Sequence, residues 1–586
     1  MNHQDLLSKK CIKFLGFVMV FICLAALIVP TPGHDTSYWI SRLYLFGEEI
    51  RANGIWKFPY YIYSDCYNGY GYALPMFYCD VFLLFPAVMV ALGLPVNMAY
   101  SFALAFFLAL RFGLSFGAVK IALSQNELET TVQPEGQSEQ DWHNRRLNQC
   151  GLLFAFLYSV FPYMLDNAFE RGALGELIAG AFLPLIFACI YRIIHRENVP
   201  KRICLWLAFG LSGVLCSHVV TTVLVAVVIT VYVMIKMPVL WKKKKRLWML
   251  VQSALMAVCL SAFWLFPFLE QFLVGSPGVA EGTPEYYALG IKTWFLPTEL
   301  RDAFRLYILD DYNTVFKWEP SGFVYPLLLA VVLWVRFRKV LENKTIKRCL
   351  LVAWGLVIGI SCKPLIRLLA VPLGLVQFPW RILWLVALLT AIFLTYALAK
   401  INRKGWTYLT IAVCLGCAAA TSGIAWVRQV RFQEPIPNYK ELGMDTLYLP
   451  EGAWWQMAGE RGEVVDATQT GVQYTWERQD EEILLDYSGN SGQVTFRLPL
   501  HYYLGYTAYD MINECDLEVT ASDVGLVSVT VDGFDSGSIR VAYTGTVIQK
   551  FAKVLSILAW LGVLVYAAVS ARAERSDRKT VGKKQE

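Results

Sequence analysis

Nine ionisable side chains stand near the ends of long apolar segments, where they could carry acid–base or phosphate-binding chemistry. They are His34, Asp35, Glu170, Arg171, Glu176, His218, Glu270, Lys363 and Arg381. Ionisable groups at membrane depth are costly and usually functional. A carboxylate can take a proton as a general base, and a guanidinium matches a phosphate group through two parallel hydrogen bonds. We expect the intervening loops to bring these side chains around one cavity, with Asp35 as the catalytic residue and the others as substrate-binding residues.

Each of these residues also has a structural reading. Asp35 begins an Asp-Thr-Ser sequence, which is a good helix start, so its side chain could simply cap a helix. That helix would carry a lipid-facing stripe formed by Trp39, Leu43, Phe46 and Ile50. The neighbouring His34 could be structural, and His218 could be an ordinary turn residue. The sequence leaves both readings of these three residues open.

The basic candidates have alternatives of the same kind. Arg171 and Glu176 are five residues apart, so they do not stack on one face of a regular helix. A loop could pair either of them with a substrate, or the two could neutralise each other. Arg381 directly follows Pro379-Trp380 and could anchor to lipid phosphate as its side chain reaches the interface. The same geometry would hold the phosphate of a lipid-linked substrate.

The elements that position these residues are membrane helices. The chain has 586 residues, of which 56% are hydrophobic and 17% are charged, whereas soluble domains carry about 25% charged residues. Many apolar runs approach the roughly 17–25 residues that cross a bilayer. The sequence therefore predicts a polytopic α-helical membrane protein. Its 14 cysteines show no convincing metal-ligand spacing.

Basic loops fix the predicted orientation, because cytoplasmic loops carry an excess of Lys and Arg. The basic stretches are Arg192–Arg202, Lys242–Arg246, Arg336–Arg348, Lys400–Lys404 and Arg572–Lys584. Their parity predicts about twelve spans with both termini in the cytoplasm. It also requires Leu74–Gly93 to lie in the interface as part of a first outer loop, 31–95. Residues 204–235 become a hairpin that turns at Ser217-His218.

Residues 428–546 differ in character from the rest of the chain. Charge rises, and apolar residues alternate with polar ones in Val494–Leu498 and Val527–Val531. Gly-rich and Asp-Gly turns separate these runs, which predicts an extracytoplasmic antiparallel β domain resembling a sandwich. The predicted domains are a membrane domain 1–427, the β domain 428–546, a final span 547–570 and a basic tail 571–586.

Several short motifs, in this order, resemble a bacterial membrane-protein family. They are Gly33-His34-Asp35, Tyr70-Gly71-Tyr72, Arg171–Glu176, Ser217-His218, Phe263–Pro267 and Gln377–Arg381. The family is called "6-pyruvoyl-tetrahydropterin synthase-related" and is similar to the YfhO-like proteins and, more distantly, to GT-C-type glycosyltransferases. The resemblance covers roughly residues 14–400, and Tyr502–Tyr506 and Gly537–Val541 look like the tail of YfhO-like proteins. Nothing in the chain resembles a soluble pterin enzyme.

The resemblance implies a GT-C-like fold and a glycosyltransferase of the bacterial plasma membrane. Such an enzyme transfers a sugar from a polyprenyl-phosphate donor to a cell-envelope glycopolymer or lipid acceptor at the outer face. Asp35 matches the acid in the first outer loop that activates the acceptor. Arg171–Glu176 matches the second outer loop by location only. The resemblance implies no cofactor; a divalent metal is conceivable but has no paired-acid signature to support it. No nucleic-acid partner is expected.

Two other functions fit the same sequence. A transporter or flippase of lipid-linked glycans would share the charged outer region, but it should also carry charges deep in its spans. Arg111 is the clearest such charge. A non-catalytic envelope assembly protein would rely on its β domain and would not need Asp35.

Overall fold

The chain folds into two compact units, each built from separate stretches of sequence. The computed structural model describes residues 5–28, 35–123, 139–197, 199–274, 298, 304, 321–373, 376, 378–431, 448–453, 465–479 and 482–582. The first unit comprises Met1–Ile40, Pro95–Ala257 and Ile291–Pro437, and the second comprises Ser41–Leu94, Val258–Gly290 and Asn438–Glu586.

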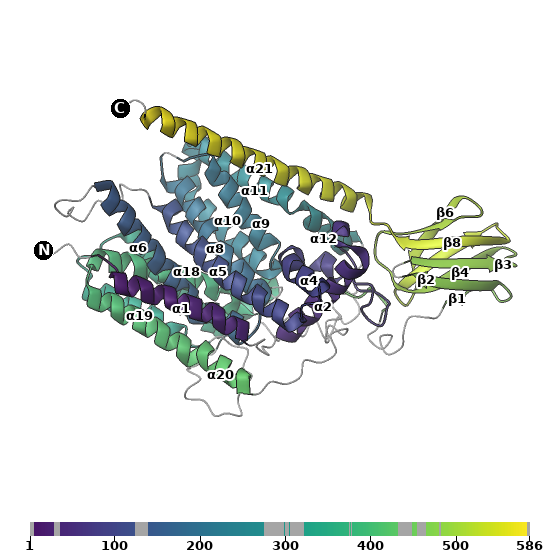
Figure 1. Cartoon of the computed structure of the whole chain (residues 1–586), viewed down its shortest axis with the longest axis horizontal. Coiled ribbons are helices and arrows are strands. Elements are labelled where there is room, and N and C mark those ends of the chain that lie inside the picture. The colour runs from purple at the N-terminus through teal and green to yellow at the C-terminus, as the bar shows by residue number, and fades with distance from the viewer. Residues whose placement is uncertain are drawn as a thin grey trace. The chain divides into compact units, whose positions relative to one another are not determined.

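The first unit is a helical bundle centred on α8. Its helices begin with α1 (Lys9–Ile28), α5 (Val96–Ala122), α6 (Glu139–Ser159), α7 (Pro162–Phe169), α8 (Leu174–His195), α9 (Arg202–Leu215), α10 (Val219–Lys242) and α11 (Lys244–Leu260). They continue with α15 (Val324–Arg336), α16 (Lys344–Ser361), α17 (Lys363–Leu373), η6 (Pro379–Ile382), α18 (Leu383–Ile401), α19 (Lys404–Ala418), the π-helical turn η7 (Ala419–Gly423) and α20 (Ile424–Arg431). The central α8 packs against α5 and α9, and the three run side by side in Figure 1.

Helix length and composition support a multi-pass membrane protein. Within the described residues, 7 helices are long and apolar enough to cross a bilayer, or up to 10 if each bent helix pair counts as one span. The predicted number of about twelve stays a prediction. The third predicted span, near 149–167, is broken into α6 and α7, which meet at 55°. The predicted hairpin over 204–235 does turn at Ser217-His218, between α9 and α10.

The second unit begins with most of α2 (Thr36–Asn53) and with η1 (Ile55–Lys57). The stretch expected to lie in the interface is divided into α3 (Leu74–Phe77), η2 (Val81–Leu83) and α4 (Leu84–Ala91), none of them long enough to span a membrane. Leu43, Phe46 and Ile50 of α2 are buried in protein, so the predicted lipid-facing stripe is wrong for these positions. A buried ion pair holds the segment together, because Arg42 Nε donates to Asp80 Oδ1 at 2.8 Å.

Eight strands follow in the same unit. They are β1 (Asp466–Ala467), β2 (Gln473–Gln479), β3 (Glu482–Ser488), β4 (Gln493–His501), β5 (Tyr506–Asp510), β6 (Cys515–Ala521), β7 (Leu526–Asp532) and β8 (Ser536–Tyr543). They form one antiparallel sheet in the order β1-β4-β7-β6-β5-β8-β3-β2. The predicted β domain before the last helix is confirmed, but its strands make a single continuous sheet rather than two separate ones.

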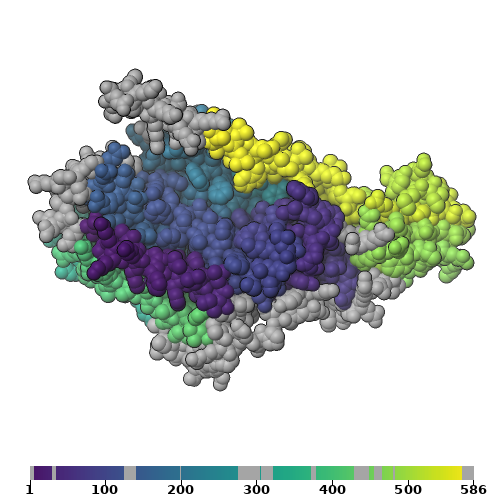
Figure 2. Space-filling model, viewed as in Figure 1, coloured from purple at the N-terminus to yellow at the C-terminus, as the bar shows by residue number. Residues whose placement is uncertain are grey.

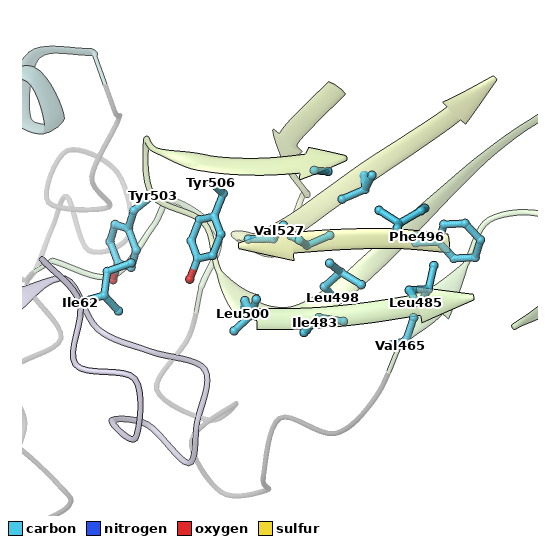
Figure 3. Packing of buried hydrophobic residues seen from close by; sticks show 14 of the residues in the cluster. Ile62, Val465, Ile483, Leu485, Phe496, Leu498, Leu500, Tyr503, Tyr506 and Val527 are labelled. Atoms are coloured by element: carbon cyan, nitrogen blue, oxygen red, sulfur yellow. The ribbon is translucent and has the colours of Figure 1, made fainter. Parts of the chain in front are cut away.

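One apolar core joins both halves of this sheet. Alternation along β4 and β7 turns Val494, Phe496, Val529 and Val531 to the same side, where they meet Ile539 of β8. Ile62 belongs to the same core, and Figure 3 shows it beside Tyr503 and Tyr506 at one end. The loop before α3 therefore packs on the sheet as part of one body.

The second unit ends in a long helix, α21 (Val547–Gly582), which leaves the sheet directly (Figure 1). In Figure 2 the strands form a rounded body from which α21 runs as a yellow ridge. The helix α12 (Ala262–Val274) contacts both the β domain and α21. Leu504 N, just before β5, donates to Gln271 Oε1 of α12 at 3.1 Å, and Phe263 N of α12 donates to Ser556 Oγ of α21 at 2.8 Å. The predicted domain boundaries at 427 and 546 stay a prediction.

Candidate functional site

The turn between α7 and α8 builds the centre of the candidate site in the first unit. α7 ends where the amides of Glu170 and Arg171 both donate to the carbonyl of Asp166, at 3.0 and 2.8 Å. Gly172 then adopts a positive φ of 65°, which reverses the chain within two residues. α8 begins at Leu174 and places Glu176 in its first turn, where the helix dipole favours a negative charge.

Glu176 is a buried carboxylate held between two guanidinium groups. Arg171 Nη1 lies 3.1 Å from Glu176 Oε2 and its Nη2 lies 3.2 Å from Oε1. Arg381 Nε, more than two hundred residues along the chain, lies 3.0 Å from Oε1. The Tyr163 hydroxyl donates to Oε2 at 2.8 Å. The predicted proximity of Arg171 and Glu176 is thus an ion pair, and Arg381 joins it.

Aromatic rings and α7 fix the two arginines. The Arg171 guanidinium lies over the Trp380 ring, 4.4 Å from its centroid, and Nη1 donates to Asn167 Oδ1 at 2.6 Å. Arg381 donates from Nη1 to the carbonyl of Val376 at 3.0 Å. Both arginine side chains are less than 10% exposed. These contacts hold two positive charges around one carboxylate. Guanidinium groups bind phosphate oxygens through the same kind of charge-assisted hydrogen bond.

Asp35 lies beside this cluster at the start of α2. Its backbone amide donates to the carbonyl of Arg171 at 2.8 Å, and its carbonyl accepts from Trp39 N at 3.2 Å. Its carboxylate Oδ2 is 4.0 Å from Arg171 Nη2, and the side chain is 32% exposed, unlike that of Glu176 at 5%. Asp35 therefore stands where a helix cap would stand and also keeps a solvent-facing carboxylate next to the arginine.

Two glycines make this approach geometrically possible. A Cβ atom on Gly172 would lie 2.1 Å from Thr36 Oγ1, closer than any real contact. A Cβ on Gly175 would lie 3.0 Å from the carbonyl of Ser217 and 3.3 Å from His218 Cδ2. The start of α2 can therefore pack closely on Gly172, and the turn before α10 can pack closely on Gly175, because neither glycine has a side chain.

His218 caps α10 and faces the cluster. Its Nδ1 accepts from Thr221 N at 3.2 Å. Withdrawal from water is the main reason that the pKa of His218 is lowered to about 4. Glu176 and Asp35 oppose this shift, and Arg381 and Arg171 add to it. The imidazole is therefore neutral at pH 7 and can accept or donate a hydrogen bond without adding charge.

The remaining predicted residues have other surroundings. Glu170 is half-buried at the end of α7. Lys363 is exposed as the first residue of α17 and does not enter the buried cluster. Glu270 belongs to the second unit, where its Oε2 accepts from Thr546 Oγ1 at 2.6 Å. His34 lies outside the described residues.

Sequence reasoning missed the supporting residues Tyr163 and Asn167. They are four residues apart on α7, so one helix face carries both toward Arg171 and Glu176. Polar side chains at this spacing in an apolar stretch were the available signal. In the described part of the chain, no three His, Cys, Asp or Glu side chains group in a way that could hold a metal ion.

Comparison with known proteins places most of this cluster in one family. The family model described as "6-pyruvoyl-tetrahydropterin synthase related domain; membrane protein" matches residues 142–428. No curated protein and no solved structure matches the chain. The match contains Arg171, Glu176, His218 and Arg381, whereas Asp35 precedes it. The family predicted from the motifs is thus confirmed, and residues 142–428 of this chain belong to the 6-pyruvoyl-tetrahydropterin synthase related membrane proteins.

Proposed function

We propose that this protein is a GT-C-type glycosyltransferase of the bacterial plasma membrane. It would transfer a sugar from a polyprenyl-phosphate donor to a cell-envelope glycopolymer or lipid acceptor at the outer face, with both termini in the cytoplasm. The observation that carries the proposal is the partly exposed Asp35 carboxylate 4.0 Å from Arg171, which is itself held in a two-arginine cluster. A candidate base and a candidate phosphate site are thereby adjacent.

The charges of the cluster suit a phosphate leaving group. Arg171 and Arg381 carry two positive charges, and Glu176 and Asp35 carry two negative charges, so the resting cluster is neutral. If Asp35 takes a proton, the cluster gains one positive charge. The leaving phosphate gains one negative charge in the same step. The negative charge that develops on the leaving phosphate is therefore stabilised by the positive charge that the cluster gains beside it.

The proposed step balances as a single displacement. The acceptor hydroxyl gives its proton to Asp35, and its oxygen forms a bond to the anomeric carbon. The bond between that carbon and the phosphate oxygen breaks, and its electron pair leaves with polyprenyl phosphate. One displacement inverts the anomeric centre. Asp35 then returns the proton to water, which its exposed side chain can reach.

The mid-span charge expected of a transporter has a structural use. Arg111 of α5 is fully buried and donates to the carbonyls of Met164 at 2.8 Å and Ser159 at 3.2 Å. Ser159 is the last residue of α6 and Met164 lies in the first turn of α7, so Arg111 contacts both sides of the break between these helices. Arg111 therefore completes the hydrogen bonding of a broken helix, and no transport path is needed to account for it.

Transfer by the purified full-length protein tests the proposal. The protein in lipid nanodiscs would be incubated with radiolabelled polyprenyl-phosphate glucose, galactose or mannose and with envelope extract as acceptor. We expect transfer from at least one donor and a loss of roughly 100-fold or more in Asp35→Asn. Asp65→Asn, which alters an exposed aspartate, is the matched control and should stay active. Absence of transfer from every donor, or full activity in Asp35→Asn, would contradict the proposal.

A further inference from the structure

Asp166 is a second buried carboxylate, and the proposed reaction does not use it. It lies on α7, is 0% exposed and belongs to the first unit. α7 is the second half of a broken span, and irregular backbone at membrane depth is a common setting for ion sites. A charged carboxylate in such a place requires a partner, because burying it alone is expensive.

The hydrogen bonds of Asp166 account for only one of its two oxygens. Oδ1 accepts from Ser422 Oγ at 2.7 Å. Ser422 lies in the π-helical turn η7, and single π turns within helices frequently occur at functional sites. Oδ2 is buried, and the described residues supply no hydrogen-bond partner for it. The backbone amide of Ser321 faces the carboxyl group, and the buried Ser321 Oγ is likewise without a partner in the described part of the chain.

The nearby positive charges make their hydrogen bonds elsewhere, and only Arg171 acts on Asp166, through its charge. Arg171 bonds Asn167 and Glu176, and Arg381 bonds Glu176. Arg111 bonds the carbonyls at the helix break. Glu176 itself is a like charge and cannot neutralise Asp166.

Among the described residues, the other helices packed against α7 add no closer charge, and the basic residues of α8, Arg192 and His195, lie in its last turn. η7 contains none, and α18 and α19 carry one lysine each, Lys400 and Lys404, at their junction. Ser422 is eighteen positions after Lys404 along continuous helix, which corresponds to about 27 Å. The charged groups of α6 all lie in its first eight residues, Glu139–Arg146, whereas its last residue is the one near α7. Among the described residues, therefore, none pairs directly with Asp166, which leaves a bound species to neutralise it.

We propose that Asp166 binds a monovalent cation, either a proton or an alkali-metal ion, between its Oδ2 and the hydroxyl of Ser321. One carboxylate with neutral hydroxyl groups balances a single positive charge, and oxygen ligands suit a hard cation. The carbonyl of Asp166 also accepts the amides of Glu170 and Arg171. Occupancy of this site therefore stabilises the turn that presents Arg171 to the cluster.

Thermal unfolding of the full chain in nanodiscs tests the proposal and separates the two cations. The melting temperature would be measured from pH 5.5 to 8.5 in NaCl, KCl and N-methylglucamine chloride at equal ionic strength. A proton site predicts wild type losing stability relative to Asp166→Asn as pH rises, with equal curves in the three salts. An alkali-metal site predicts stabilisation of wild type by Na⁺ or K⁺ that Asp166→Asn lacks.

Identical pH and salt dependence in wild type and Asp166→Asn would overturn the proposal, whereas Asp65→Asn should behave as wild type. Should Asp166→Asn fail to fold, Ser422→Ala removes only the Oδ1 hydrogen bond. It should shift the pH midpoint, or change the cation concentration for half-maximal stabilisation, several-fold. An unshifted midpoint and concentration in Ser422→Ala would also count against the site. None of these readouts depends on glycosyl transfer.

Discussion

At the scale of single residues, Glu176 is the organising group of the candidate site. A carboxylate withdrawn from water is stable only if its charge is paired and its oxygens are hydrogen-bonded. The Glu176 carboxylate accepts hydrogen bonds from Arg171, Arg381 and Tyr163. The sequence predicts Glu176 as a substrate-binding residue, whereas the proposed mechanism gives it the role of positioning the two arginines.

Glu176→Gln should destabilise the protein strongly, because it leaves two buried guanidiniums around a neutral amide. Removing one partner of a buried ion pair costs about 3–5 kcal/mol. The measurement is thermal unfolding in detergent. Glu482→Gln is the matched control, since Glu482 also pairs with an arginine, Arg540, but at an exposed position. Equal shifts in the two variants would contradict the assigned role of Glu176.

His501 gives the second unit a defined response to acid. It is 2% exposed, its amide donates to the carbonyl of Tyr70, and its Nδ1 lies 2.7 Å from the carbonyl of Gly71. Burial lowers the pKa of His501 from 6.5 to about 4, only partly opposed by the bond to Gly71. The unfolded chain therefore binds a proton in a range where the folded chain does not.

Stability contributed by neutral His501 should be present above pH 6.5 and lost as pH falls toward 4. The loss reaches about 3 kcal/mol if the whole pKa difference is expressed. Melting temperatures of wild type and His501→Gln between pH 8 and pH 4.5 measure it. Wild type should lose stability faster than the variant on acidification. A constant difference across this range would show that His501 does not titrate as inferred.

At the scale of elements, the short turn between α7 and α8 matters more than its length suggests. Gly172 has a positive φ and no room for a side chain. The start of α2 therefore approaches so closely that Asp35 and Arg171 share a backbone hydrogen bond. The position of the candidate base thus depends on a residue that has no functional group of its own.

Gly172→Ala should lower the melting temperature and, under the proposed function, also transfer activity. The added Cβ must move Thr36, and alanine resists the φ of 65°. Gly355→Ala is the control: Gly355 lies in α16 and a Cβ there meets nothing within 4 Å, so the change should be neutral or slightly stabilising. If Gly172→Ala melts as wild type does, the close packing of Thr36 on this turn is wrong.

Much of the element content follows from the sequence by simple physics. Hydropathy and basic loops indicate the spans, and Ser217-His218 marks a turn because it lies midway in an apolar run bounded by basic loops. Alternation in Val494–Leu498 and Val527–Val531 predicts the strands. The break at Ser159–Pro162 was not predicted, because the run stays apolar through it and periodicity does not register a bend.

Some residues of the candidate site can likewise be predicted from the sequence, and others cannot. Arg171, Glu176 and Arg381 can be selected because charge in an apolar setting is conspicuous. Their convergence on one carboxylate depends on long-range packing, which a single sequence does not contain. Asp166, Tyr163 and Asn167 were overlooked because they stand inside a short helix rather than at the end of a span.

At the scale of the whole molecule, the chain separates a helical membrane unit from a unit that combines the first loop, the β sheet and α21. The stretch 41–94 joins the sheet through Ile62, Met76 and Phe77, although more than three hundred residues lie between them and β1. This shared core requires the loop and the sheet to be on the same side of the membrane. The orientation of both remains a prediction from the basic loops.

Cysteine labelling in intact cells tests that orientation. In a variant without native cysteines, Ser491→Cys in the exposed β3–β4 turn should react with a membrane-impermeant maleimide. Lys243→Cys, in the basic stretch between α10 and α11, should react only after the cells are opened. The opposite pattern would reverse the topology and place Asp35 and the sheet in the cytoplasm.

The central claim is that Asp35 acts in the chemical step while the arginine cluster holds the donor phosphate. The most direct measurement compares donor affinity and single-turnover transfer in wild type and Asp35→Asn, with the polyprenyl-phosphate sugar that wild type uses. The proposed mechanism predicts donor affinity that is unchanged or tighter and a transfer rate lower by roughly 100-fold or more. Unchanged transfer, or a loss explained wholly by weaker donor binding, would contradict it.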